Sequence, residues 1–222
     1  MARETEIKLK IEDLGVFRRR LKGLGGKAVG PGTGRVHEEN VIFDTPEGGL
    51  AKHGQLLRMR TQRIGVGGGA GAKGLKERVL VTFKRPPDGE AKSTRFGDRG
   101  SRYKVREEIE LEVGEPGKLA AIFEGLGMRA WFRYEKYRTT YRLPGAKAWA
   151  KGLLIEVDET PIGTFVELEG PAEAIDRGAQ ELGYERRDYI LKNYLVLYVE
   201  ECRRKGIEPR DMVFEEASRK AK

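Results

Sequence analysis

The chain begins with a strict alternation of charged and apolar side chains. Glu4, Glu6 and Lys8 occupy every second position, and Ile7 and Leu9 lie between them. Because successive side chains of an extended strand point to opposite faces, this segment predicts a strand with one charged face and one apolar face. On its own, the pattern is typical of an edge strand whose charged face meets solvent.

The same alternation returns along the whole chain, with pairs of charges two residues apart opposite apolar neighbours. The predicted strands cover residues 4–11, 34–43, 55–63, 79–84, 103–113, 131–143, 153–159 and 164–169. Since so many strands carry one charged face, we expect these faces to line a shared interior.

Segments with helical periodicity separate some of these strands. Asp13 is placed to cap a helix that ends before Gly25, and proline in the first turn favours two later helices, at Pro116 and Pro171. The predicted helices cover residues 14–24, 116–126, 171–182 and 188–202. The strands are spread over the chain without a clear linker, so we predict one domain over residues 1–200. A charged tail follows over 201–222, either frayed or with a short helix around Met212.

Two biased stretches interrupt the strand pattern, one rich in glycine at 65–74 and one polar at 88–100. A phosphate-cradling loop needs a Gly-Lys-Ser/Thr sequence at the start of a helix, whereas here Ala72 precedes Lys73 and Gly74 follows it. Between two strands, the first stretch is therefore predicted to be a flexible hairpin loop.

The formal net charge of the 222 residues is +8, which favours a polyanionic partner such as nucleic acid, an anionic membrane or a small phosphorylated molecule. The aromatic residues are not interleaved with basic clusters, and no helix with grouped base-reading side chains is apparent, so nucleic acid is disfavoured. No apolar run approaches the ~18 residues that span a bilayer, and the N-terminus lacks a hydrophobic signal region. We therefore expect a cytoplasmic protein without a membrane partner.

The predicted helices favour an inward orientation of the charged strand faces. Each helix has an apolar stripe that needs a partner, and the apolar wall of the sheet can supply it. The alternative is a conventional barrel with an apolar interior and charges in solvent. With the charges inside, unpaired like charges would be costly unless a charged ligand binds among them.

Charges of both signs suit one ligand, a polyphosphate with its metal ion. Basic side chains can donate to phosphate oxygens, and the candidates are Lys8, Arg58, Arg60, Lys84, Arg106, Lys136 and Arg138. Carboxylates suit a hard divalent cation such as Mg²⁺, and the candidates are Glu4, Glu6, Glu108, Glu110, Asp158, Glu167 and Glu169.

An ordered series of short motifs resembles the CYTH domain of the triphosphate tunnel metalloenzymes. The series is Glu4-x-Glu6-x-Lys8, Asn40-Val-Ile-Phe43-Asp44-Thr45-Pro46, Leu56-Leu-Arg58-Met-Arg60, Thr82-Phe-Lys84, Arg106-Glu-Glu108-Ile-Glu110, Lys136-Tyr-Arg138, Ile155-Glu156-Val-Asp158 and Gly163-Thr-Phe165-Val-Glu167-Leu-Glu169. The resemblance implies an α+β protein built on a closed antiparallel eight-stranded barrel, with a polar tunnel inside and helices outside. It also implies activity on triphosphates with Mg²⁺ or Mn²⁺.

The resemblance assigns expected roles to particular residues. Four carboxylates, assisted by Asp158, would hold metal; they are Glu4, Glu6, Glu167 and Glu169. The phosphates would be bound by a basic track in which Lys8, Arg58, Arg60 and Lys84 serve catalysis. A further phosphate contact is expected at Lys192 or Asn193, just before Tyr194. The stretches near 65–74 and 88–100 are longer than the shortest loops of the family.

These observations predict metal-dependent hydrolysis of a small-molecule triphosphate, with inorganic triphosphate as the favoured substrate. Phosphoryl transfer depends chiefly on positioning and charge neutralisation, which basic side chains and a metal can supply. The alternatives are a thiamine triphosphatase, a class IV adenylate cyclase, and a polyphosphate- or nucleotide-binding module without catalysis.

Overall fold

The computed structural model describes residues 2–30, 34–65, 75–87 and 102–215. Its strands are β1 (Ala2–Lys10), β2 (Lys27–Val29), β3 (Arg35–Asp44), β4 (Leu56–Gly65), β5 (Leu75–Arg85), β6 (Lys104–Glu112), β7 (Arg129–Arg142), β8 (Leu154–Thr160) and β9 (Gly163–Glu169). Its α-helices are α1 (Leu14–Gly23), α2 (Gly49–Lys52), α3 (Pro116–Gly125), α4 (Ala172–Glu181) and α5 (Tyr194–Lys205).

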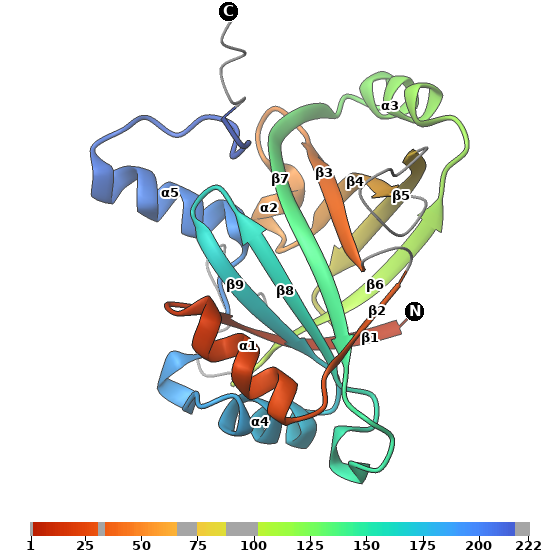
Figure 1. Ribbon diagram of the computed structural model, residues 1–222. Helices are drawn as coiled ribbons and strands as arrows, with labels where there is room; N and C mark the ends of the chain where they lie inside the picture. The colour runs from red at the N-terminus through yellow and green to blue at the C-terminus, as the bar shows by residue number, and fades with distance from the viewer. Residues whose placement is uncertain (1, 31–33, 66–74, 88–101, 216–222) are drawn as a thin grey trace, which may run out of the picture.

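Eight of these strands form a closed antiparallel barrel (Figure 1). They follow the order β7-β3-β4-β5-β6-β1-β9-β8, and pairing of β7 with β8 closes the ring. The short strand β2 stays outside the ring, where it pairs with β7 beyond the end of β3. The predicted fold class is therefore confirmed, with one strand that the hydrophobic pattern did not indicate.

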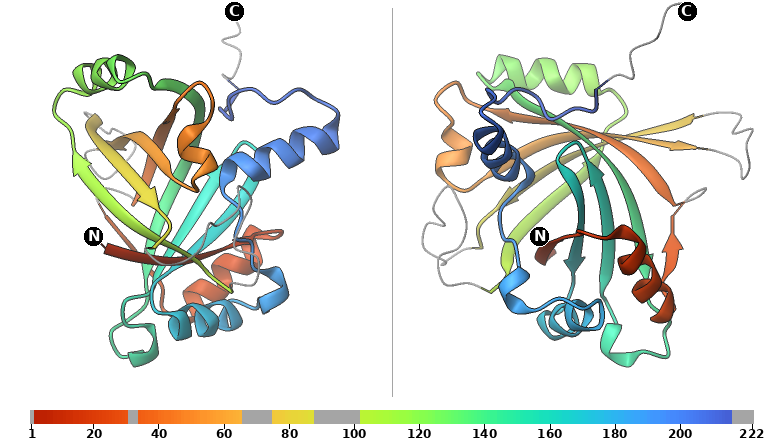
Figure 2. Two further views of the ribbon diagram at one scale, coloured as in Figure 1. Left: turned by 180° about the vertical axis from the view of Figure 1, so that it is seen from behind. Right: turned by 60° about the vertical axis from the view of Figure 1, so that its left-hand side comes forward.

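The apolar outer wall of β1, β8 and β9 lies under two helices, as the sequence predicts. Ile7 and Leu9 of β1 pack in one buried cluster with Phe17 of α1 and Ile175 of α4. Figure 2 shows α1 and α4 on this side of the barrel. Because alternate residues of these strands face the opposite way, their charged side chains point into the barrel.

The last helix starts later than the sequence pattern indicates. Residues 186–188 form a 3₁₀ turn, and Ile190 exchanges two backbone hydrogen bonds with Lys8, of 3.0 and 2.8 Å. The prediction of a helix from residue 188 is wrong because this pairing with β1 holds the chain extended. α5 begins only after Asn193, whose side chain accepts a hydrogen bond from the Val196 backbone at 2.9 Å.

The chain after α5 crosses back to the barrel. Described residues 206–215 contain no helix, so the expected short helix around Met212 is absent there. Instead the Met212 backbone donates to Arg133 O and accepts from Glu135 N, both at 2.9 Å. The Met212 side chain is almost fully buried.

The two predicted loops at 65–74 and 88–100 lie almost entirely outside the described residues. Among the helices that the structure describes, none has both the length and the apolar character needed to cross a membrane.

Candidate active site

The lumen is lined by alternate residues of all eight barrel strands. Register pairs side chains of opposite charge across neighbouring strands, for example Lys8 with Glu167, Arg138 with Asp158, and Lys84 with Glu108. The strand alternation seen in the sequence thus brings basic and acidic groups from distant parts of the chain into one interior.

One ionic network lies deep on the β7, β8, β9 side. Lys8 Nζ is 2.6 Å from Glu167 Oε1, and Lys136 Nζ is 2.9 Å from Asp158 Oδ2. Arg138 contacts Asp158, Glu156 and Glu167. Burial opposes the charge on Glu167, but Lys8 and Arg138 outweigh it and hold the pKa of that carboxyl well below its usual value. Asp158 also accepts a hydrogen bond from the Tyr194 hydroxyl at 2.7 Å.

A second network joins β1, β5 and β6. Lys84 Nζ lies 2.6 Å from Glu4 Oε2 and 3.5 Å from Glu108 Oε2, and Lys104 pairs with Glu6. Burial would raise the pKa of Glu6, but the neighbouring lysines, Lys104 first among them, lower it to about 2. Both β1 carboxylates therefore hold ammonium groups where a metal cation could bind.

Arg58 differs from these residues because it faces hydroxyls. Its guanidinium donates to Tyr134 Oη at 3.3 Å and to Thr82 Oγ1 at 3.2 Å, while its buried Nε has no hydrogen-bond partner. Among the residues that the structure describes, no carboxylate lies within 4.0 Å of it. Glu38 and Glu108 stabilise its charge from farther away, so the pKa of Arg58 is raised despite burial. Its unpaired Nε can still donate to an anion.

Glu38 and Asn40 on β3 belong to the lumen although sequence reasoning did not select them. Arg60 donates to Glu38 Oε1 at 3.3 Å and to Asn40 Oδ1 at 3.2 Å, and Gln62 donates to Glu38 at 2.9 Å. Lys136 Nζ lies 3.5 Å from the other oxygen of Glu38. Glu38 is only 1% exposed, and Arg60 and Lys136 balance its buried charge and lower its pKa.

Lys104 and Glu156 were also missed as site residues. Each stands two positions before a residue that the sequence did select, Arg106 and Asp158 respectively, and so shares its strand face. The alternation already placed Glu156 on the charged face beside Asp158 without giving it a role, and extending the alternation one step before Arg106 would have found Lys104.

Several lumen carboxylates of β1, β6, β8 and β9 repel one another. Burial raises the pKa of Glu169 to about 8, and the charges of Glu4 and Glu156 add to the shift. The pKa values of Glu108 and Glu156 are also raised, chiefly by burial. A divalent cation would relieve this repulsion, and carboxylate oxygens are the ligands that Mg²⁺ prefers. The donor chemistry therefore fits a metal, although no three acidic, His or Cys side chains converge as a preformed metal site in the described part of the chain.

Three predicted site residues occupy less central places. Lys192 lies outside the lumen network, with its half-exposed Nζ 2.7 Å from Glu200 Oε1 of α5. Glu110 is exposed and accepts from Thr82 Oγ1 at 3.0 Å. Arg106 is half-buried, and one of its NH groups donates to Val105 O at 2.7 Å.

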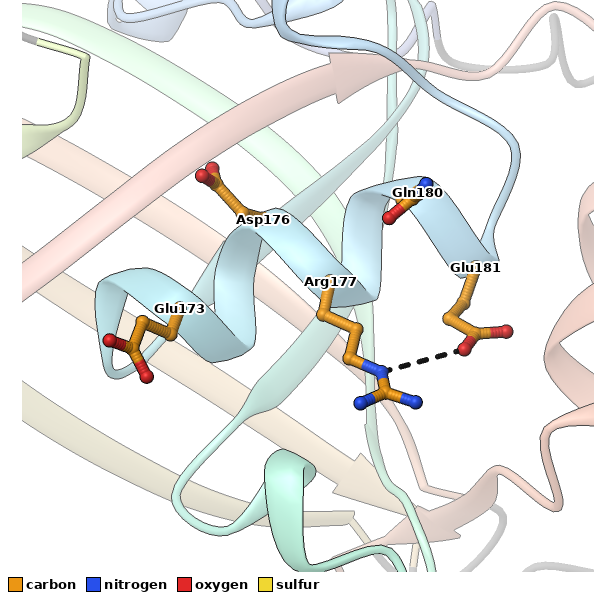
Figure 3. Close-up of a pocket in the computed structure, with 5 residues that line it drawn as sticks. All are labelled: Glu173, Asp176, Arg177, Gln180 and Glu181. Atoms are coloured by element: carbon orange, nitrogen blue, oxygen red, sulfur yellow. Dashed lines mark ion pairs between the residues drawn. The ribbon is translucent and has the colours of Figure 1, made fainter.

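A shallow hollow on the outside of the barrel is unrelated to these charges. Figure 3 shows its lining, which comes from α4 alone and includes Asp176, Arg177 and Glu181. Asp176 is already bound by Arg186 and by Tyr189. The barrel interior, which gathers charged side chains from all eight barrel strands, is therefore the candidate site.

A closed antiparallel barrel with apolar walls outside and buried ion networks inside defines a class of tunnel proteins for charged small molecules. Residues 2–194 match the CYTH domain, and the chain belongs to this family. The family includes triphosphatases and adenylate cyclases.

Similar proteins cover most of this chain. A Methanocaldococcus jannaschii protein, provisionally named an adenylate cyclase, is 25% identical over 199 residues, which make up 87% of this chain and 97% of that protein. The structure of a Pyrococcus horikoshii protein matches with a TM-score of 0.64 and 22% identity, covering 89% and 99% of the two chains. A provisionally named adenylyl cyclase from Hippeastrum, described as having a dominant triphosphatase activity, matches with a TM-score of 0.54 and 20% identity, covering 93% and 97%.

Proposed function

We propose that this protein hydrolyses the terminal phosphoanhydride bond of a small triphosphate inside the barrel, with inorganic triphosphate as its substrate. The observation that carries the proposal is Arg58, a buried guanidinium that faces only hydroxyls and has a free donor. A phosphate oxygen would supply the missing acceptor and a negative charge in direct contact with the guanidinium.

The other lumen cations support binding of several phosphates rather than one. Lys8, Arg60 and Lys84 come from three different strands and all point into the same interior. Each is held in place by a carboxylate, which costs some attraction for an anion but fixes the position of the cation. Such preorganised charge is what stabilises a phosphoryl group during transfer.

The carboxylates suited to a metal in this proposal are Glu4, Glu6 and Glu169, with Glu108 beside them. Mg²⁺ or Mn²⁺ bound there would neutralise phosphate charge and favour ionisation of a water. Asp158 and Glu167 are less suited to this role because Lys8, Lys136 and Arg138 already neutralise them. When substrate and metal bind, Lys84 and Lys104 would leave Glu4 and Glu6 and contact phosphate oxygens instead.

Cyclisation of ATP is the second candidate, supported by the provisional name of the M. jannaschii relative. Cyclisation requires a pocket for the base and a positioned ribose hydroxyl. No set of residues in the described part of the chain demands either. Thiamine triphosphate requires less room than that and remains an alternative substrate. A binding module without catalysis would bind triphosphate and release no phosphate.

A phosphate-release assay tests these options. Inorganic triphosphate, thiamine triphosphate and ATP are each compared with Mg²⁺, Mn²⁺ and a chelator, and cyclic AMP is measured in the ATP reactions. We expect metal-dependent release of phosphate, fastest from inorganic triphosphate. Cyclic AMP as the main product, or tight binding without phosphate release, would contradict the proposal.

The variant Arg58→Met tests the residue on which the proposed function rests. We expect activity to fall by at least about 100-fold, as for loss of other preorganised charges. Stability should change less than in the control below, because no described carboxylate lies within 4.0 Å of Arg58 and its removal leaves no directly paired charge alone. The control Lys136→Met instead removes one of the two cations beside each of Asp158 and Glu38, which keep Arg138 and Arg60. It should destabilise the protein by up to about 3–5 kcal/mol. Full activity of Arg58→Met would contradict the assignment.

A further inference from the structure

α3 is an apolar helix in which no residue is buried. It carries Leu119, Ile122 and Phe123, and the Phe123 ring packs against Phe43 of β3 at a centroid distance of 5.1 Å. Ile122 and Leu126, which share a face of the helix at a spacing of four residues, are 57% and 71% exposed. A helix of ten residues is marginal without tertiary packing, so this uncovered face of α3 needs a partner.

The outer wall of the barrel beside α3 is also uncovered. Phe43, which contacts Phe123, is the β3 neighbour of Leu57. From there, strand register joins apolar side chains into two rows across the outer faces of β4, β5 and β6. The rows are Leu57-Phe83-Ile109 and Met59-Val81-Leu111. Ile109 and Leu111 end these rows and are 44% and 61% exposed. On the opposite side of the barrel, α1 and α4 cover the corresponding wall (Figure 2).

The exposed side chains of this region provide the apolar area that a stable interface needs. We define the apolar face as Ile109, Leu111, Ile122, Leu126 and Trp131, the last of which lies on β7 and is 53% exposed. Together they expose on the order of 500 Å² of surface. A standard interface buries about 800 Å² on each partner, a little over half of it apolar. The apolar face alone reaches that apolar share.

Charges that flank the apolar face on β4, β5, β6 and α3 form pairs within the chain. The pairs are Arg63 with Glu77, Arg85 with Glu107 and Lys118 with Glu115, at 2.9, 2.8 and 2.7 Å. α1, on the opposite side of the barrel, instead carries four basic residues and no acidic one. Although the net charge is +8, two copies can therefore meet through the apolar face with little repulsion.

We propose that the apolar face is the interface of a homodimer with two-fold symmetry. In such a dimer the same face of both copies is in contact, so every contact forms twice. α3 of one copy packs through Ile122 and Leu126 on the β6 wall of the other, as α1 and α4 pack on the opposite wall within one chain. A second copy suits this role because α3 needs cover whenever the chain is folded, and another copy is present wherever the chain is made.

Sedimentation velocity of the chain over a range of concentrations tests the proposal. We expect a species of twice the chain mass of 25.0 kDa at micromolar concentration. The Tm should rise with protein concentration, because association stabilises the folded state by mass action. A monomer at every concentration measured would overturn the proposal. Neither measurement depends on the reaction that the lumen performs.

Leu126→Asp locates the interface. The side chain is 71% exposed in the single chain, so the variant should fold, whereas the dimer would bury the new charge twice. We expect the dissociation constant of the dimer to rise at least about 100-fold. Leu111→Asp should act in the same way, because helix and wall meet reciprocally. The matched control is Ile207→Asp just after α5, where the side chain is 54% exposed and lies outside the apolar face.

Circular dichroism verifies the fold of all three variants, and two further results would overturn the proposal. A dimer that survives both Leu126→Asp and Leu111→Asp would place the interface elsewhere on the chain. Binding of the monomer to vesicles of phosphatidylcholine and phosphatidylglycerol, abolished by Leu126→Asp, would assign the apolar face to a membrane surface instead.

Discussion

Glu169 is the lumen residue whose ionisation is most sensitive to the surrounding charges. Burial and the carboxylates of Glu4 and Glu156 raise its pKa to about 8, whereas Glu6, its neighbour across the β1–β9 pair, is held at about 2 by lysines. Two glutamates in adjacent positions thus have opposite shifts because only one of them has a cation beside it.

The shift of Glu169 predicts a specific pH dependence of stability without metal. The folded protein keeps this proton between the ordinary pKa of 4.5 and about 8, while the unfolded chain releases it. The folded state binds more protons, so its stability falls as pH rises through this range, by up to about 1.4 kcal/mol per unit from this group. We expect Glu169→Gln to flatten the decline of Tm between pH 6 and 8.

Mg²⁺ provides the control for this prediction. A cation that binds the ionised carboxylate displaces its proton, so added Mg²⁺ should reduce the decline in the wild type and have little effect in Glu169→Gln. Parallel pH profiles for the two proteins without metal would contradict the assigned shift.

At the scale of residues, the sequence revealed the inward charges but not their partners. Alternation placed Lys8, Glu167 and Arg138 on charged faces, and the structure brings them together. It could not show that Arg58 lacks a carboxylate while Arg60 has Glu38, since that depends on the register of β3 against β4. Ion pairing across strands is a property of register, which the local pattern does not contain.

Among the elements, the segment after α5 has the clearest structural role. It occupies the side of β7 that β8 does not reach, since β8 pairs only with the 137–141 part of β7. The Met212 side chain is only 1% exposed and packs in one apolar cluster with Phe132 and Phe165.

Met212→Ala tests this role of the segment. Removing a buried methionine side chain leaves a cavity, and we expect the free energy of unfolding to fall by about 2–5 kcal/mol. Chemical denaturation measures the change. The control is Val213→Ala at the neighbouring position, which is 41% exposed and should change stability by less than about 0.5 kcal/mol. Equal effects of the two substitutions would show that the segment is not packed as described.

The main strands and three of the longer helices follow directly from the sequence, and the exceptions have local causes. α2 depends on Asp44, whose carboxylate accepts from the backbones of Leu50 and Ala51 at 2.8 and 3.0 Å. The three residues of β2 are too few for a period to be recognised. The start of α5 is displaced by pairing between Ile190 and Lys8, residues far apart in the chain. Long-range backbone pairing of this kind leaves no mark on hydrophobic periodicity.

Over the whole molecule, the helices cover the apolar outer wall of the barrel unevenly. α1 and α4 bury the outer faces of β1, β8 and β9. On the far side, Ile109 and Leu111 of β6 remain 44% and 61% exposed. The helices therefore cover the part of the wall that carries Lys8 and Glu167 on its inner face.

Phe132, Phe165 and Met212 belong to an apolar cluster beside the lumen cations, and this cluster has a consequence for the kinetics of the proposed reaction. Under the proposed function, a terminal phosphate bound at Arg58 lies beside this cluster and the diphosphate part lies farther from it, so we expect the two products to leave in sequence. With ATP as substrate, ADP should dissociate first and inhibit noncompetitively, whereas inorganic phosphate should dissociate last and compete with ATP. Product-inhibition measurements distinguish this order from random release, in which both products would compete. A patch of aromatic packing more than a hundred residues from Glu4 in the chain would thus determine which product regulates turnover.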